Sequence, residues 1–388
     1  MAAAAADKDD DSRMLFQPAG LSKESYGLVL VFVFALCYGL MGTFIQLAVS
    51  TGMSSMELVV LRSTFQGLIV VASMCYVTTT TTADAEAFAY RADDGGAQAP
   101  AAAATTIRLI QQPFGTRKVF PIVLARGVIG GVGLLLYFYT MASIPLGDAT
   151  SVLALSPVIT VVASSVVLGE QLTSSVLAAA FATVIGAVLI AKPTLLFHAA
   201  ADGSTSMHNN NPWGYITGLC GSCTASAVVM LVRMAGTTGG VHTLQLLFSW
   251  CLFGSLYAVI ILLTGAGGGE DAGAIFSWPS SPQATIYVAF MVVFGVIGHF
   301  CMNYGGQFAP AGLSSIVRAS LVLWGYCFEF FVFRQVPDVW TVLGALLIVS
   351  SVSIIAWQKY QGAKEKAAAA ATEAKTTELT ESTAGRMA

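Results

Sequence analysis

The stretch ARGVIGGVGLLLYFY, residues 125–139, places an arginine at the start of a glycine-rich apolar run. Two classes of protein use such runs: glycine loops cradle phosphates in nucleotide-binding proteins, and glycines let helices pack closely in membranes. A phosphate loop would follow a strand and end in a lysine, and the sequence offers neither. The stretch therefore predicts a membrane-spanning helix, and Arg126 is the residue whose position requires a reason.

The composition places the whole chain in a lipid bilayer. Hydrophobic residues make up 56% of the 388 residues and charged residues only 10%, with a mean hydropathy of +0.74. Soluble domains carry about 25% charged residues, so this chain lacks the polar groups to cover a soluble fold. The net charge is −3 and no basic run is present, which argues against a nucleic-acid partner.

A membrane-spanning helix needs about 20 mainly apolar residues. The chain has enough such runs to predict an all-α polytopic membrane protein with ten transmembrane helices, at residues 27–49, 55–77, 119–141, 147–168, 173–192, 213–234, 243–264, 284–306, 311–333 and 338–358. The remaining segments are a low-complexity loop predicted to be disordered, a shorter loop and two polar tails, at 78–118, 193–212, 1–26 and 359–388.

The two halves of the chain repeat one another weakly. Five residues of the first half recur 165 residues later, and the pairs are Gly130 and Gly295, Gly133 and Gly298, Tyr139 and Tyr304, Pro145 and Pro310, and Gly147 and Gly312. This spacing covers five spans, an odd number, so the two copies must cross the membrane in opposite directions. Residues 27–192 and 213–358 are therefore predicted to be inverted repeats, an arrangement common among secondary transporters.

The distribution of lysine and arginine predicts the orientation. With ten spans, both termini lie on one side of the membrane, together with most of the basic residues: Lys8, Arg13, Lys23, Arg91, Arg108, Arg117, Lys118, Arg233, Lys359, Lys364, Lys366, Lys375 and Arg386. The other side has only Lys192 and Arg334, and Arg62, Arg126 and Arg318 fall inside spans. Basic loops stay in the cytoplasm, so both termini are expected to be cytosolic. The membrane itself is either the plasma membrane or one of the secretory pathway.

Several motifs resemble a known family. The segment RGVIGGVGLLLYFYTMASIPLGDATSVLALSPVITVVASSVVLGEQLT, residues 126–173, resembles the third and fourth helices of EamA-type carriers in the drug/metabolite transporter superfamily. Its marks are PLGD at 145–148, Ser156-Pro157 and Gly169-Glu170. LVVLRSTFQ at 58–66, LVRMAG at 231–236 and VPDVWTVLGALLIVSS at 336–351 resemble solute carrier family 35, subfamily G.

The resemblance implies ten helices in two inverted five-helix repeats, alternating access and no cofactor. It leaves the substrate open, because this superfamily carries nucleotide sugars, amino acids, organic anions and drugs. One departure from symmetry stands out: the second half has Arg334-Gln335 where the first half has Gly169-Glu170. A symmetric gating role for that carboxylate is therefore in doubt.

Charged residues inside spans are the candidates for binding a solute, because they are costly there and normally face the bundle interior or water. Arg62 has Gln66 one turn further on the same helix face, and the alternative role for Arg62 is an ion pair with Glu57 or Glu329. Arg126 either faces a cavity or extends back to the lipid headgroups. Gly127 and Gly131 form a GxxxG pair, and the glycines beside Arg126 are interpreted as helix-packing residues.

Two later spans, and the helix face on which Arg126 lies, contain further candidate residues. Arg318 and Glu329 share a helix face but lie about 16 Å apart along the axis, so each needs another partner. His299 and Asn303 are one turn apart and form a candidate polar pair, with His299 either a packing residue or a titrating group suited to proton coupling. Tyr137 completes the stripe of Arg126, and Pro157 is a candidate hinge, with a plain kink as the alternative.

These residues predict a secondary transporter of a small organic solute by alternating access. Three arginines against one glutamate leave the interior positive, which favours an anion with a carboxylate or phosphate group. The alternatives are a nucleotide-sugar or amino-acid/metabolite exporter of the same superfamily, or a non-transporting membrane scaffold. The solute would move with a co-transported proton or against an exchange substrate, and a homodimer is compatible with the sequence. No metal or cofactor site and no catalytic constellation is predicted.

Overall fold

The computed structural model describes residues 22–53, 55–92, 109, 111–143, 152–191, 212–264, 278–279, 281–334, 339–358 and 361. Within these ranges every regular element is a helix. Eight helices are long and apolar enough to cross a membrane, and two further apolar helices, Ser156–Val167 and Ser174–Ile190, are shorter. The prediction of an all-α polytopic membrane protein is confirmed, whereas the count of ten spans and the inverted repeats stay predictions.

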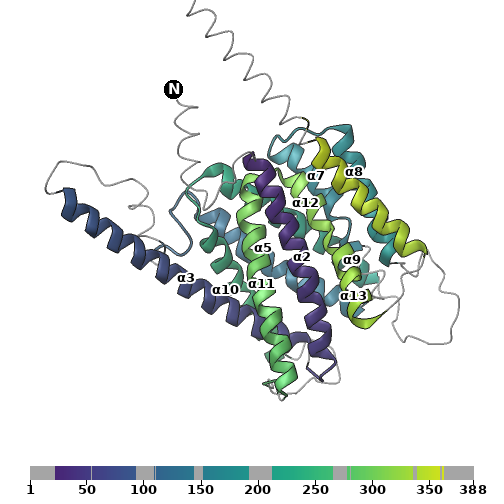
Figure 1. Cartoon of the computed structure of the whole chain (residues 1–388), viewed down its shortest axis with the longest axis horizontal. Coiled ribbons are helices and arrows are strands. Elements are labelled where there is room, and N and C mark those ends of the chain that lie inside the picture. Colours follow the sequence, from purple (N-terminus) through teal and green to yellow (C-terminus); the bar gives the residue numbers. More distant parts are fainter. Residues whose placement is uncertain are drawn as a thin grey trace, which may run out of the picture.

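The helices follow the predicted order of apolar runs (Figure 1). Their bounds are α2 (Lys23–Val49), α3 (Ser55–Ala92), α5 (Phe120–Ser143), α7 (Ser156–Val167), α8 (Ser174–Ala191), α9 (Pro212–Thr238), α10 (Thr243–Thr264), α11 (Pro282–Phe308), α12 (Ala311–Ala319), α13 (Leu321–Phe333) and a C-terminal helix, Val339–Gln358.

One helix is longer than the sequence predicted. Helix α3 continues past the expected end at residue 77 as far as Ala92, so the first part of the predicted disordered loop 78–118 is helical. The alanine-rich segment ADAEAFAYRA, residues 83–92, contains good helix formers, which explains the extension. Figure 1 shows this end of α3 running out of the bundle. Residues 93–108 of the predicted loop, the loop 193–212 up to residue 211 and nearly all of both tails lie outside the described residues.

Two predicted spans are interrupted. In the described part of the run 147–168, a turn at residues 154–155 separates the helical residues 152–153 from α7, which begins at Ser156. Pro157 lies in the first turn of α7, where the missing N–H of proline costs nothing. The run 311–333 is divided into α12 and α13 at Ser320, whose backbone N–H and hydroxyl both donate to the carbonyl oxygen of Val317. The two interruptions, at Leu155 and Ser320, are 165 residues apart, which is the spacing of the sequence repeat.

Side-chain hydroxyls of α9 donate to two carbonyl groups on either side of the first interruption. Ser222 donates to the carbonyl oxygen of Val152 at 2.7 Å, and Ser226 donates to that of Ser156 at 3.0 Å. A buried carbonyl without a partner would be costly in a membrane. Helix α9 therefore stabilises the start of α7 in its position.

The most extensive helix pair joins the two halves of the chain. Helices α2 and α11 lie side by side (Figure 1) and approach closely where both have a glycine. A Cβ atom on Gly27 would lie 2.6 Å from the carbonyl oxygen of Gly305, and a Cβ on Gly305 would lie 2.7 Å from that of Gly27. Only glycine allows such an approach. Similarly, Gly186 of α8 and Gly344 of the C-terminal helix each lie against the other's carbonyl oxygen.

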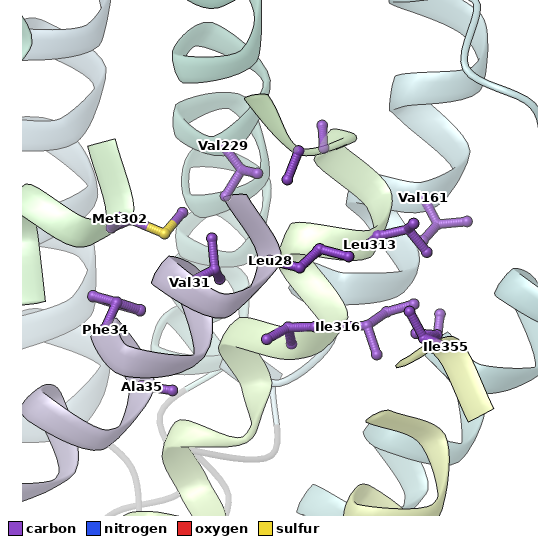
Figure 2. Close-up of a cluster of buried hydrophobic side chains, with 14 of the residues drawn as sticks. Leu28, Val31, Phe34, Ala35, Val161, Val229, Met302, Leu313, Ile316 and Ile355 are labelled. Carbon is purple, nitrogen blue, oxygen red and sulfur yellow. The ribbon is translucent and has the colours of Figure 1, made fainter. Parts of the chain in front are cut away.

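The largest apolar cluster lies between the two halves (Figure 2). It brings together residues from α2, α7, α9, α11, α12 and the C-terminal helix, including Leu28, Val31, Phe34, Val161, Val229, Met302, Leu313, Ile316 and Ile355. Val31 and Ile316 are completely buried. Since lipid is as apolar as these side chains, the cluster holds the helices together by close packing rather than by burial from water.

We expect Gly305→Ala to lower the melting temperature of the purified protein in detergent. The added Cβ would meet the Gly27 carbonyl and the Leu30 Cβ, both at 2.7 Å, and such overpacking costs about 1–3 kcal/mol. Gly42→Ala on α2 is the matched control, because a Cβ at Gly42 would have no neighbouring atom within 4 Å and alanine is the better helix former. Equal melting temperatures for the two variants would contradict the close approach of α2 and α11.

Candidate functional site

Five of the predicted residues converge in the interior of the bundle. We call this group the arginine cluster, and it consists of Arg62 and Gln66 of α3, Arg126 of α5, His299 of α11 and Arg318 of α12, together with Tyr38 of α2 and Trp250 of α10. Gln66, Arg126 and His299 are buried, with at most 5% of each exposed. Six helices from both halves of the chain therefore supply one polar site.

His299 connects two of the other helices. Its Nδ1 atom lies 2.8 Å from the amide nitrogen of Gln66, and its Nε2 atom lies 3.2 Å from Nη2 of Arg126. The ring stands edge-on to Trp250, with the ring centres 4.3 Å apart. These contacts favour a polar function over the alternative interpretation of His299 as a simple packing residue.

Arg62 lies between two aromatic rings. Its guanidinium carbon is 5.0 Å from the ring centre of Tyr38 and 5.2 Å from that of Trp250, and its Nη2 donates to the Tyr38 hydroxyl. Cation–π contacts of this kind offset part of the cost of removing a guanidinium from water. Arg62 therefore rests on aromatic rings, and the predicted alternative of an ion pair with Glu57 is not what the structure shows.

Arg126 turns toward the middle of its helix. A Cβ atom on Gly130, one turn further along α5, would lie 2.6 Å from Nη1 of Arg126, so the guanidinium lies beside Gly130 and away from the helix end at Phe120. This direction is opposite to the one that an arginine extending to the nearer headgroups would take. The arginine is 2% exposed and part of the cluster.

The glycines of the opening stretch have two different roles. Gly127 packs against the backbone of α10, since a Cβ there would lie 2.8 Å from the carbonyl oxygen of Ser249. Gly130 packs against Trp250 of α10, where a Cβ would lie 2.8 Å from Cδ1, and it also makes room for the guanidinium of Arg126. Its repeat partner Gly295 does the same for Arg62, whose Nε would be 3.1 Å from a Cβ at that position.

Arg318 joins the two interrupted spans. It lies in the last turn of α12, just before the break at Ser320, and its Nη2 donates to the hydroxyl of Ser156 at 3.1 Å, where α7 begins. Arg318 lies close enough to Arg126 for the two positive charges to repel one another. The three arginines thus lie within electrostatic range of the same site.

Positive charge in the cluster has no matching carboxylate among the described side chains. None of the three arginines forms an ion pair there, and buried Nε of Arg62 and buried Nε and Nη1 of Arg126 have no hydrogen-bond acceptor. A buried hydrogen-bond donor without an acceptor costs about 1–3 kcal/mol, and more when the group is charged. An anion with several oxygen atoms is the kind of ligand that would satisfy them.

The other candidates lie at varying distances from the cluster. Asn303 is buried, and its amide donates to the carbonyl of His299 on its own helix. Tyr137 is 44% exposed and lies outside the buried cluster. It was predicted to share a helix face with Arg126, but residues on one face at different depths can have different surroundings. The side chain of Glu329 lies outside the described residues. Pro157 starts α7 rather than interrupting a continuous helix, and no group of three metal-ligating side chains occurs in the described part of the chain.

Sequence reasoning missed Tyr38 and Trp250. Tryptophan and tyrosine inside membrane proteins concentrate near the two interfaces, where their polar atoms reach water. Both residues instead occur in the middle part of apolar runs, Tyr38 in 27–49 and Trp250 in 243–264. That unusual depth was a signal that they contact something polar inside the bundle.

A second polar contact, which we call the end clasp, ties the halves together away from the cluster. The carboxylate of Glu170 accepts from the N–H groups of Ala311 and Gly312, at 2.8 and 3.2 Å, at the start of α12. Arg233 donates to the carbonyls of Gln307 and Phe308 at the end of α11, and its Nε lies 3.7 Å from Glu170 Oε1. Each charge thus lies at the helix end whose dipole it complements.

The apolar helices define a polytopic helical membrane protein, and comparison with known proteins specifies the family. The model of the EamA-like transporter family matches residues 97–192 and 212–357. The chain therefore belongs to the EamA-like transporter family, whose members are transporters rather than enzymes.

Individual relatives agree with this assignment. The chain is 26% identical over 235 residues to solute carrier family 35 member G1 of Homo sapiens, covering 61% of each chain. It is 24% identical over 238 residues to the pseudopaline exporter CntI of Pseudomonas aeruginosa, covering 60% of this chain and 74% of the exporter. The match thus spans about three fifths of the human relative. A crystal structure with 15% sequence identity shares the fold, with a TM-score of 0.60 over 85% of this chain and 98% of that one.

We expect Gly130→Ala to weaken solute uptake by the reconstituted protein, with KM raised at least about tenfold, equivalent to ~1.4 kcal/mol of binding. The new Cβ would lie 2.6 Å from Nη1 of Arg126 and 2.8 Å from Trp250 Cδ1, so the guanidinium must move. Gly67→Ala, next to Gln66, is the control, because its Cβ would meet only Cys251 at an ordinary 3.5 Å. An unchanged KM for Gly130→Ala would show that the position of Arg126 does not matter.

We expect the two charged side chains of the end clasp to stabilise the protein jointly. Glu170→Gln and Arg233→Ala should each lower the melting temperature, at a cost of about 1–3 kcal/mol, because charge-assisted bonds to helix ends are lost. The double variant should lose less than the sum, since the two side chains act together. Lys118→Ala, at an exposed position, is the control, and strictly additive losses for the pair would refute the coupling.

Proposed function

We propose that the protein is a secondary transporter of a small organic anion bearing a carboxylate or phosphate group, which binds at the arginine cluster. The observation that carries this proposal is the set of three arginines whose side-chain partners are neutral, with no carboxylate paired to them among the described side chains. A guanidinium binds carboxylate and phosphate oxygens through two parallel hydrogen bonds. A non-transporting scaffold would gain nothing from keeping such costly charges in its interior.

The helix arrangement supports alternating access by two inverted repeats. If the repeats are exchanged, the pair α2–α11 becomes α9–α5, and both pairs are in extensive contact. The two interrupted spans also correspond, and Arg318 of one reaches Ser156 of the other. Interrupted helices near the middle of the membrane mark the solute site in many transporters. The inferred mechanism is a rocking of the repeats about this site.

The end clasp fits the same scheme as one of two gates. It joins α9, the start of α12 and the α7–α8 connection, whereas the second repeat has Arg334-Gln335 at the corresponding place. The two gates are therefore chemically different. From the positive-inside rule we infer that both termini are cytosolic, which puts the end clasp on the cytosolic side in a plasma-membrane or secretory-pathway membrane.

Two modes of coupling are compatible with this proposal. One is exchange against a second anion, and the other is co-transport of a proton through Glu329 or another cavity carboxylate. The relative CntI is named as an exporter, so an exporter of a metabolite is the alternative within the same family. An amino acid or a nucleotide sugar would satisfy the arginines through its carboxylate or phosphate.

The test is uptake and efflux by purified protein in liposomes. The probes are radiolabelled succinate, inorganic phosphate, glutamate and a uridine diphosphate sugar, with tetraethylammonium as the cationic control. We expect an anion to be transported and the cation to be excluded. Transport of the cation alone would overturn the proposal.

Substitution of the arginines refines the test. Arg62→Ala and Arg318→Ala should each abolish transport of the selected anion while the protein stays folded in the membrane, as judged by size-exclusion chromatography and melting temperature. Lysine at either position should restore little activity, because a point charge does not reproduce the planar fork of the guanidinium. Normal uptake by both alanine variants would remove the basis for an anion site.

A further inference from the structure

The contacts of His299 determine which of its ring nitrogens carries the proton. Nη2 of Arg126 lies 3.2 Å from Nε2 of the ring, and an arginine N–H can only donate a hydrogen bond. Nε2 must therefore be the unprotonated nitrogen that accepts this bond. In a neutral ring the proton is then on Nδ1.

Gln66 supplies an independent observation that agrees with this assignment. Its side-chain amide lies 2.8 Å from Nδ1 with the nitrogen toward the ring, which leaves its Oε1 buried without a partner. The two ends of an amide have nearly the same shape and are assigned from their hydrogen bonds. As placed, Gln66 and Arg126 would both donate to one neutral ring, which has a single bare nitrogen. Turning the amide round resolves this conflict, because Oε1 then accepts from Nδ1–H and the NH2 group takes the position of the unpaired oxygen.

We propose that Gln66 fixes His299 as the neutral Nδ1–H tautomer, and that both are positioning residues which hold Arg126 ready for the anion. Gln66 Oε1 accepts from Nδ1–H, Nε2 accepts from Nη2 of Arg126, and Nε and Nη1 of Arg126 stay available. In this arrangement His299 carries no proton across the membrane. The proposal rests on the proposed anion site and assigns the groups that prepare it.

The charged and titratable groups around the ring favour its neutral state. They are Tyr38 of α2, Arg62 of α3 and Arg126 of α5. Among the described side chains no carboxylate contacts the ring. A second proton on His299 would add a positive charge beside Arg62 and Arg126 and would turn Nε2–H toward Nη2 of Arg126, where both groups would be donors.

The tautomer can be observed directly and without transport. The four histidines of the chain can be labelled with nitrogen-15, and the ring nitrogens of the protein in lipid nanodiscs can be followed by magnetic resonance near neutral pH, with His299→Gln identifying the signals of His299. We expect one protonated nitrogen, assigned as Nδ1, and one bare nitrogen. A protonated Nε2, or two protonated nitrogens, would overturn the proposal.

Uptake of radiolabelled succinate and inorganic phosphate provides the second test. His299→Gln keeps an oxygen acceptor for Arg126 but loses the ring that Gln66 holds, so its KM should rise less than that of His299→Leu, and the shape of its pH profile should follow the wild type. His299→Leu removes the acceptor and should raise KM roughly tenfold, the effect of one lost buried hydrogen bond. A pH profile that disappears in His299→Gln would show that His299 titrates during transport and would contradict the proposal.

Gln66 variants separate positioning from simple packing. Gln66→Glu still accepts from Nδ1–H, but its negative charge stabilises a doubly protonated ring, so its uptake should fall as the pH falls below about 6.5, the ordinary pKa of histidine, and recover at higher pH. Gln66→Met cannot accept and should have a raised KM at every pH. If Gln66→Glu and Gln66→Met behave alike, Gln66 is a packing residue and the proposal fails.

The two proposals fail in different ways. If the wild-type protein carries neither succinate nor phosphate nor any other anion, the anion-transport proposal is lost, while the magnetic resonance result still decides the tautomer. If the wild type carries an anion but His299 has the other tautomer, only the positioning role is lost.

Discussion

The cost of keeping guanidinium groups among apolar helices constrains the centre of this bundle. An arginine in the middle of a membrane helix costs roughly 2.5–3.5 kcal/mol on insertion scales, and three occur here. Their partners among the described side chains are an imidazole nitrogen, a tyrosine hydroxyl, a serine hydroxyl and two aromatic rings. All of these are neutral groups, which reduce the cost of burial without cancelling the charge. The site is therefore stabilised and yet still positive, as a carrier that must release its solute requires.

Several glycines of the bundle lie either at close backbone approaches or beside these charges. Gly127, Gly27 and Gly305 lie where a neighbouring backbone approaches, while Gly130 and Gly295 lie beside a guanidinium. The latter two are repeat partners, 165 residues apart. At these two positions, which the sequence pairs as repeat partners, each half has a glycine beside a guanidinium, although the two arginines come from different helices of the first half.

Much of the fold could be predicted from the sequence, because hydropathy in a membrane has few structural solutions. The apolar runs gave the order of the helices and nearly all their positions. The interruptions at Leu155 and Ser320 were harder to predict. Pro157 pointed to the first, whereas the second depends on the local bonding of Ser320 with Val317, which hydropathy does not reveal. The extension of α3 to Ala92 was missed because a threonine run precedes the helix-forming segment.

By itself the sequence determined that the chain enters a membrane as a bundle of apolar helices, and that Arg62, Arg126 and Arg318, which lie within apolar runs, need partners inside the protein. These conclusions follow from the cost of polar groups in hydrocarbon, which depends on residue type and position alone. Only the tertiary structure decided which residues are the partners of these arginines. Gln66 and His299 are 233 residues apart, and Arg126 and His299 are 173 apart. Their contact depends on the rotation and depth of α3, α5 and α11, which are set by packing against neighbouring helices and are not encoded in any one span.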